Sequence, residues 1–184
     1  MRTLGQIEPQ LLVVAAFSRY PAALQWVEQQ LLESFGPLAL KSPPWPFTQT
    51  RYYERTMGAD LQKQFFVHKH LVPMDRLAEV KRTTIGIEAV LQSQQRYPEE
   101  RPVNLDPGFI NLGKFCLAST KDQAHRIYLR DGIFAEVTLQ FRDKHFRPNP
   151  WTYPDYQQPH VLAFLDEARD YFRQVRQGPR EAVG

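Results

Sequence analysis

A continuous apolar run, Leu11–Phe17, is the feature that most constrains the fold of this chain. The run contains no polar side chain, and such a segment is typical of a β-strand that is buried on both faces. A strand of this kind cannot lie at a solvated surface, because its whole length is apolar. The sequence therefore predicts a fold built on a sheet, with this strand inside it.

Three amphipathic stretches each begin at a proline, namely Pro21, Pro73 and Pro159. Proline is favoured at the first position of a helix, where its missing N–H costs nothing. The stretches end at Gly36-Pro37, Pro98 and Gly178-Pro179. We predict three helices whose apolar stripes are Leu24, Val27, Leu31 and Phe35; Leu77, Val80, Thr84, Ile87 and Leu91; and Val161, Phe164, Leu165, Ala168, Phe172 and Val175.

The segments between these helices predict short strands. Expected strands or strand fragments are Leu38–Lys41, Tyr52–Glu54, Gln64–Leu71 and Pro102–Leu105. Asp106-Pro107-Gly108 is predicted to be a turn, because these residue types favour turns. Asn111–Ser119 fits either a short helix capped by Asn111 or a strand, and we favour the helix.

The stretch from Ile127 to Phe141 predicts a β-hairpin with a defined register. Its second half alternates, so that Ile133, Ala135, Val137, Leu139 and Phe141 share the face that is expected to meet the core. A three-residue loop, Arg130-Asp131-Gly132, puts Ile127 and Leu129 on that same face. This register places Arg126 opposite Glu136, and the sequence therefore predicts an ion pair between them.

The order of these elements predicts an α+β fold. It corresponds to a ferredoxin-like β-α-β-β-α-β unit with a C-terminal hairpin and helix added, on a mixed or antiparallel sheet. The 184 residues are expected to form a single domain, with a loose leader at residues 1–10 and a disordered tail at residues 178–184.

Composition excludes several classes of function. The 23 basic and 20 acidic residues are interspersed, which argues against nucleic-acid binding. Cys116 is the only cysteine, which is typical of a reducing cytoplasm. No apolar segment approaches the ~20 residues that cross a bilayer, so no membrane association is expected. The sequence assigns no cofactor and no oligomeric state.

A polar run within Leu117–Phe141 contains most of the candidate site residues. Lysine and arginine bind phosphate or carboxylate groups, and histidine exchanges protons near neutral pH. The candidates for anion binding are Lys114, Thr120, Lys121 and Arg126, and the acid–base or orienting candidates are His125, Glu136 and Asp122. The aromatic wall is assigned to Tyr128, Trp151 and Tyr153, and further ligand-binding candidates are Asn104, Asp106 and Asp155.

Simpler interpretations stand beside these assignments. Ser119-Thr120-Lys121-Asp122 also fits a polar turn, and without a Gly-x-x-x-x-Gly-Lys-Ser/Thr loop the chain is not a P-loop GTPase. The pair of Arg126 and Glu136 also fits an ordinary ion pair on an exposed sheet face. His68 and His70 share a strand face, but surface histidines on an edge strand explain them better than zinc ligands, and no metal is assigned.

Several long motifs resemble the bacterial family catalogued as domain of unknown function 4416. They are Val103–Ile110, Leu117–Asp122, His125–Leu129, Asp131–Leu139 and Pro150–Tyr156, with Phe35-Gly36-Pro37 and the segment from Tyr52 to Gly58. The resemblance extends over nearly the whole chain. The family has no established activity, but the position of its polar motifs implies a site in the same region of the chain.

Two functions remain open from the sequence. The first is a cytoplasmic protein that binds a small anionic ligand, nucleotides included, in a polar cleft, with or without catalysis. The second is a module without enzymatic activity that binds protein or RNA through aromatic loops at Pro43–Phe47 and Trp151–Tyr156. The first requires the candidate polar side chains to line one concave pocket.

Overall fold

The apolar run of the sequence lies within strand β1 (Pro9–Ser18) of the computed structural model, which describes residues 8–177. Every residue from Leu11 to Phe17 is buried. β1 pairs antiparallel with β4 (Gln62–Pro73) on one side and with β5 (Asn104–Ile110) on the other. Pro9 and Gln10 belong to this strand although we expected them in a loose leader; residues 1–7 and the predicted tail, 178–184, lie outside the described residues.

Within residues 8–177 the sheet has nine strands, and all of its pairs are antiparallel. Its main order is β2-β4-β1-β5-β6-β8-β7, and β3 pairs with β4 while β9 pairs with β8. The remaining strands are β2 (Leu38–Lys41), β3 (Trp45–Pro46), β6 (Lys114–Ser119), β7 (Ile127–Arg130), β8 (Ile133–Arg142) and β9 (His145–Pro148). The α+β class and the antiparallel sheet are confirmed, and the sheet is larger than the predicted arrangement.

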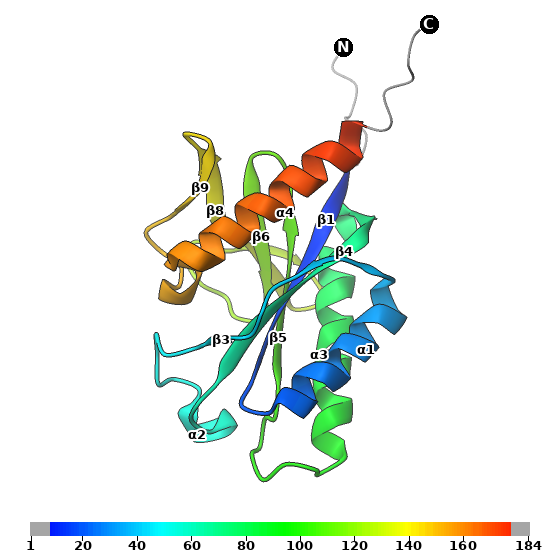
Figure 1. The fold of residues 1–184 in the computed structure, drawn as a ribbon, viewed down its shortest axis with the longest axis vertical. Coiled ribbons are helices and arrows are strands. Elements are labelled where there is room, and N and C mark those ends of the chain that lie inside the picture. The colour runs from blue at the N-terminus through cyan, green and yellow to red at the C-terminus, as the bar shows by residue number, and fades with distance from the viewer. Residues whose placement is uncertain (1–7, 178–184) are drawn as a thin grey trace, which may run out of the picture.

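Helices cover both faces of the sheet, as the apolar β1 requires (Figure 1). Leu12 and Val14 point toward helices α1 (Pro21–Phe35) and α3 (Leu77–Ser93), whose predicted apolar stripes form this core. Leu11 and Val13 point to the opposite face, which α4 (Pro159–Gln177) covers. Within residues 8–177 no helix is both long and apolar enough to cross a membrane.

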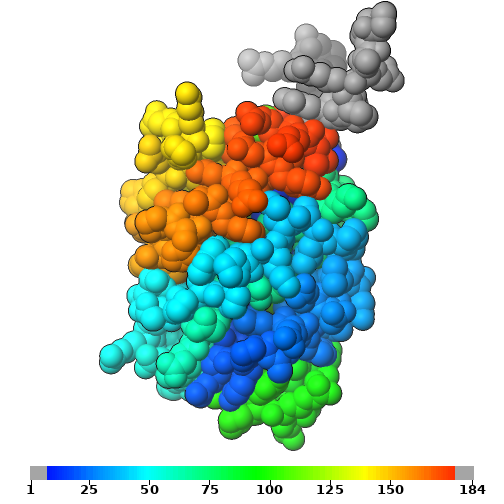
Figure 2. Space-filling model, in the orientation of Figure 1, coloured from blue at the N-terminus to red at the C-terminus, as the bar shows by residue number. Residues whose placement is uncertain are grey.

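The chain between β2 and helix α2 (Glu54–Met57) lies beside α4 on the outside of the sheet (Figure 2). The ring of Trp45 is 4.6 Å from the ring of His160 and 6.0 Å from that of Phe164, between centroids. The described part of the chain also contains two short 3-10 helices, η1 (Met74–Arg76) before α3 and η2 (Pro154–Gln157) before α4. The prolines at positions 21 and 159 begin helices as predicted, whereas α3 begins at Leu77, after η1.

The predicted turn at Asp106-Pro107-Gly108 is wrong, because these residues continue β5. A Cβ atom at Gly108 would lie 2.4 Å from the carbonyl oxygen of Cys116 on β6. Glycine is therefore required here for close approach of two strands, a role that its sequence context does not distinguish from a turn. Pro107 lies just outside the part of β5 that pairs with β6.

The helix favoured for Asn111–Ser119 is also wrong, since Lys114–Ser119 forms β6. The Asn111 side chain does act as a cap, but it accepts hydrogen bonds from the N–H groups of Gly113 and Lys114 at 2.9 and 3.0 Å in a turn before the strand. Tyr52–Glu54 is not a strand either, because a turn there leads into α2.

The hairpin has the predicted register, but its turn differs from the predicted three-residue loop. Ile127 pairs with Ala135 as predicted, but the turn contains only Asp131 and Gly132, both with positive φ, and a bulge between Tyr128 and Arg130 restores the register. The expected burial of Ile127 and Leu129 is wrong, because β7 is the edge strand and these side chains are 74% and 40% exposed.

His68 does not lie on an edge strand, since β4 runs between β2 and β1. Its side chain is buried, its Nδ1 lies 3.0 Å from the carbonyl oxygen of Gly36, and burial lowers its pKa to about 4. His70, two residues further on, is exposed. The two histidines therefore have different environments, although they are only two residues apart on one strand.

Phe172→Ala is expected to destabilise the protein by about 3–5 kcal/mol, because it leaves a cavity where α4 packs on the sheet. Phe172 is 1% exposed, whereas Val175 on the same helix is 39% exposed. Urea denaturation of both alanine variants measures the difference. Equal costs for Phe172→Ala and Val175→Ala would mean that α4 does not cover this face in solution.

Candidate functional site

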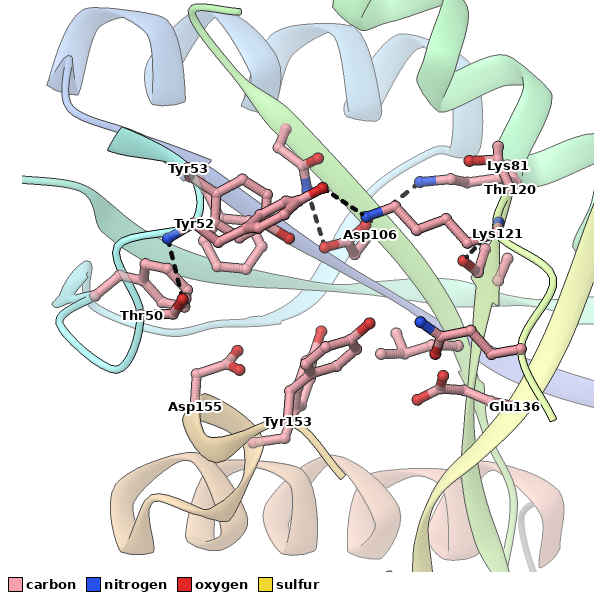
Figure 3. A pocket seen from close by; sticks show the side chains of 18 of the residues that line it. Thr50, Tyr52, Tyr53, Lys81, Asp106, Thr120, Lys121, Glu136, Tyr153 and Asp155 are labelled. Atoms are coloured by element: carbon pink, nitrogen blue, oxygen red, sulfur yellow. Dashed lines mark hydrogen bonds and ion pairs between the residues drawn. The ribbon is translucent and has the colours of Figure 1, made fainter. Parts of the chain in front are cut away.

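A pocket of about 690 Å³ opens between the sheet, α3, the chain around Tyr52 and the start of η2 (Figure 3). Its floor comes from β5 and β6, and its sides come from segments that are far apart in the sequence. Eight of the sequence candidates line it: Asn104, Asp106, Thr120, Lys121, Arg126, Glu136, Tyr153 and Asp155. The fold thus brings most of the expected polar side chains to one concavity.

The other five candidates do not line the pocket. Lys114 is exposed at the start of β6, at the opposite end from Ser119, and Asp122 and Tyr128 are exposed as well. His125 lies outside the pocket wall, where its ring stacks on Trp151 at 5.4 Å between centroids. The Nε1–H of Trp151 donates to the carbonyl oxygen of Val137 at 2.9 Å, which fixes the indole against β8.

The predicted ion pair between Arg126 and Glu136 is confirmed, and it is buried. Arg126 Nε donates to Glu136 Oε2 at 2.8 Å, and the two side chains are 2% and 1% exposed. The remaining guanidinium contacts are to Ser119 Oγ at 2.7 Å, the carbonyl oxygen of Lys121 at 3.0 Å and Tyr153 Oη at 3.0 Å. Burial opposes the charge on Arg126, but the hydrogen bonds to Glu136 and Tyr153 outweigh it and raise its pKa.

Glu136 is equally committed to protein groups. Its Oε1 accepts from Thr138 Oγ1 at 3.0 Å, and its Oε2 lies 3.2 Å from His125 Nε2. Arginine and carboxylate therefore fasten β8, the chain before β7 and the segment before η2 to one another. The exposed pair that the sequence allowed is excluded, because the segment Trp151–Tyr156 covers this face.

A second buried ion pair joins Lys63 on β4 to Asp155 on η2. The ammonium group of Lys63 lies 3.4 Å from the ring centroid of Tyr156, over its face. Burial lowers the pKa of Lys63, which the negative charge of Asp155 opposes. The hydroxyl of Tyr156 is buried and has no hydrogen-bond partner within residues 8–177.

A third polar cluster joins α3 to β5. Lys81 Nζ donates to the carbonyl oxygen of Leu105 at 2.7 Å and lies 3.4 Å from Asp106 Oδ1. The other carboxylate oxygen of Asp106 accepts from Asn104 Nδ2 at 2.9 Å. Arg101 completes the cluster by donating to the side-chain oxygen of Asn104 at 2.5 Å. This arrangement gives hydrogen-bond partners to the side chains of Asn104 and Asp106 on the floor of the pocket.

Glu88 on α3 also belongs to this cluster, but its carboxylate oxygens have fewer close partners than those of Asp106. Its Oε1 accepts from the backbone N–H of Leu105 at 2.5 Å, while its Oε2 is 3.9 Å from the nearest guanidinium nitrogen of Arg101. Burial raises the pKa of Glu88 to about 7, against the opposing effects of Lys81 and the Leu105 N–H. A carboxyl group with a pKa near neutral pH can both accept and donate a proton.

Lys121 stands at the rim of the pocket, on the loop after β6. Its ammonium group donates to the hydroxyl of Tyr52 at 3.2 Å, and Figure 3 shows the two side chains reaching toward each other from opposite sides. This hydrogen bond lowers the pKa of the Tyr52 phenol. Within residues 8–177 no carboxylate forms an ion pair with Lys121.

Sequence reasoning missed several polar and aromatic residues of the site. Lys81 and Glu88 continue the helical stripe through Leu77 and Thr84 at steps of three and four residues, and Lys63 shares the buried face of β4 with Phe65. Charged residues at core-facing positions are thus the signal that was available. The missed residues are Lys63, Lys81, Glu88, Arg101, Tyr52, Tyr53 and Tyr156.

Within the described part of the chain, no three His, Cys, Asp or Glu side chains are grouped so that they could hold a metal ion. Compared with known proteins, residues 8–172 match the family described as Domain of unknown function (DUF4416). No curated protein and no solved structure matches the chain. The family match includes every residue that lines the pocket.

Arg126→Ala is expected to destabilise the protein by about 3–5 kcal/mol, because it leaves the buried carboxylate of Glu136 without its partner. Adding Glu136→Gln to this variant should recover part of the loss, since it removes the unpaired charge. Arg130→Ala on the exposed strand β7 is the control, and its cost should be within about 0.5 kcal/mol of zero. Additive costs in the double variant would contradict a buried pair.

Glu88→Gln is expected to remove a pH-dependent loss of stability. The pKa of Glu88 is about 7 in the folded protein against an ordinary value of 4.5, so the folded state holds the proton more tightly than the unfolded chain. The free energy of unfolding of the wild type therefore falls as the pH rises between these values and levels off above them.

The free energy of unfolding of Glu88→Gln, measured relative to that of the wild type, should change by on the order of 3 kcal/mol across this pH range, at about 1.36 kcal/mol per pKa unit. Urea denaturation at a series of pH values measures it. Glu167→Gln, at an exposed position of α4, should reproduce the wild-type profile. A Glu88→Gln profile parallel to that of the wild type would show that burial does not raise this pKa.

Proposed function

This chain belongs to the DUF4416 family of domains of unknown function, and we propose that it binds a small anionic ligand, nucleotides included, in the pocket beside Lys121. We place this function in the bacterial cytoplasm, as the cysteine content and the family resemblance suggest. The family brings no activity with it, so the proposal depends on the chemistry of the pocket.

The observation that carries the proposal is that the ammonium group of Lys121, at the rim of the pocket, has no carboxylate partner within residues 8–177. The ammonium groups of Lys63 and Lys81 and the guanidinium of Arg126 already have protein partners close by. Within residues 8–177 the ammonium group of Lys121 has only the neutral phenol of Tyr52 as a partner, and a phosphate or carboxylate oxygen would offer it a much stronger charge-assisted contact. Arg126 then serves to position the Lys121 loop, because it donates to the Lys121 carbonyl oxygen.

The size and lining of the pocket support a ligand larger than a simple ion. A pocket of about 690 Å³ is in the range that accommodates small organic ligands. Tyr52, Tyr53 and Tyr153 offer aromatic faces and edges to a planar group. The unpartnered hydroxyl of Tyr156 would gain a hydrogen bond from a polar atom of the ligand or from a water molecule carried with it.

Catalysis by the residues expected from the sequence has less support. His125 and Asp122 do not line the pocket, and Glu136 is occupied by Arg126, Thr138 and His125. We therefore propose binding as the primary function of the site. Asn104, Asp106, Thr120, Tyr153 and Asp155 remain the proposed contacts around the ligand.

We also interpret the first half of the chain as a ferredoxin-like unit. Its strands have the order β2-β4-β1-β5, all antiparallel, with α1 and α3 in the connections. The strands β6 to β9 and α4 would then be an addition that builds the other half of the pocket. A fold of this kind hosts many functions, so it does not by itself support one.

The second candidate function is a module that binds protein or RNA through exposed apolar surface. The observation in its favour is the edge strand β7, where Ile127 and Tyr128 are 74% and 58% exposed. Of the two loops expected to act as anchors, only one projects: Trp151 and Tyr153 are partly exposed, while Phe47 is 7% exposed and packs inward. This makes the module the weaker of the two proposals.

Lys121→Ala is expected to weaken anion binding about tenfold or more, because a charge-assisted hydrogen bond contributes about 1.5–3 kcal/mol. A thermal-shift screen with inorganic phosphate, pyrophosphate and nucleoside mono- and triphosphates identifies the anion, and the melting temperature should rise with its concentration. Lys114→Ala, an exposed lysine at the other end of β6, is the matched control. Anions that stabilise no variant, or that stabilise Lys121→Ala as strongly as wild type, would refute the proposal.

A further inference from the structure

Resting on the proposed function, we propose that Glu88 takes up a proton when the anion binds and, as a neutral carboxylic acid, donates a hydrogen bond into the pocket. This assigns to the site a neutral carboxylic acid as hydrogen-bond donor, a group that none of the sequence candidates was expected to provide. It also makes anion affinity depend on pH near neutrality.

The geometry around Glu88 leaves one oxygen free for this role. Glu88 lines the same pocket as Lys121, and its side chain is 18% exposed. Oε1 is held by the backbone N–H of Leu105 at 2.5 Å, which fixes the carboxyl group. Oε2 has no hydrogen-bond partner within residues 8–177, since Arg101 is 3.9 Å away. A proton on Oε2 would therefore be available to a ligand.

The charged groups that face Glu88 are engaged elsewhere. On its own helix, Lys81 is bound to the Leu105 carbonyl oxygen. On β5, Asp106 is held by Asn104 and adds negative charge nearby. In the segment before β5, Arg101 donates to Asn104. Glu88 is thus a mostly buried carboxyl group whose nearest cationic nitrogen, on Arg101, lies 3.9 Å away, and burial is the largest cause of its raised pKa, about 7.

The other carboxylates of the pocket cannot take the same role, because each has close partners for its charge. Asp155 is paired with Lys63, and Glu136 accepts from Arg126 and Thr138. Asp106 accepts from Asn104 and lies near Lys81. Protonation of any of them would break close contacts that ionised oxygens make, whereas protonation of Glu88 Oε2 weakens only the 3.9 Å ion pair with Arg101.

An incoming anion changes this balance in a predictable direction. Its negative charge disfavours the ionised form of Glu88 and raises the pKa further, so binding draws a proton from solvent. The coupling is reciprocal, and the protonated protein binds the anion more tightly than the ionised protein does. A rise of about one pKa unit corresponds to about tenfold lower affinity at high pH than at low pH.

The experiment uses inorganic sulfate as the probe, because its charge does not change near neutral pH. Binding is measured by chemical-shift perturbation across a pH series in the wild type, Glu88→Gln and Glu167→Gln. In wild type and Glu167→Gln, affinity should fall about tenfold as the pH rises through about 7, as one pKa unit of coupling requires. Glutamine resembles the neutral acid, so Glu88→Gln should bind sulfate with the same affinity at every pH.

A second readout does not depend on binding. With ¹³C-carboxyl-labelled glutamate, the Glu88 resonance, identified by its loss in Glu88→Gln, should titrate near the value of about 7. The midpoint should rise with sulfate.

A midpoint at the ordinary value for glutamate overturns the inference whether or not sulfate binds. Sulfate binding that depends on Lys121 but leaves the midpoint unchanged overturns it and leaves the proposed function standing. Absence of sulfate binding at any pH counts against both, while a normal midpoint alone counts only against the role of Glu88.

Discussion

The buried contact between Arg126 and Glu136 is the interaction on which the pocket depends. It connects the end of β6 and the loop between β6 and β7 with strand β8 and, through Tyr153, with the segment before η2. Such a pair contributes little net stability, because the free energy of removing two charges from water is about as large as the free energy of their attraction. Its effect is to hold three segments, the β6–β7 loop, β8 and the chain before η2, in one arrangement, since any displacement would leave a charge buried without a partner.

The pocket repeats this arrangement on its other sides. Lys63 with Asp155 joins β4 to η2, and Lys81 with Asp106 joins α3 to β5. Each pair satisfies its own charges, so the walls are polar and yet have little charge to offer a ligand. Within residues 8–177, the groups of the pocket that these ion pairs do not engage include the ammonium group of Lys121, one oxygen of Glu88 and the hydroxyl of Tyr156. The chemistry of the site is therefore concentrated in groups that the structural pairs leave free.

The sequence predicts those features that depend on local pattern. Alternation along β8 correctly places Arg126 opposite Glu136, and prolines correctly mark the starts of two helices. It fails where a neighbour from elsewhere in the chain decides, as at Gly108, whose conformation serves close contact with β6. Lys81 and Glu88 were missed for a related reason, because a charged side chain on an apolar stripe becomes interpretable only when the pocket above it is known.

An anion in a pocket that contains four carboxyl groups needs more than one favourable cation. Asp106, Glu136 and Asp155 each have a closer cationic partner than Glu88, whose ion pair with Arg101 spans 3.9 Å, so Glu88 is the carboxylate most able to repel an anion. Its raised pKa means that this repulsion can be removed at a small cost in free energy near neutral pH, by taking up one proton. Lys121 at the rim and Glu88 on the α3 side would then act on the same ligand, one through its positive charge and the other through its proton.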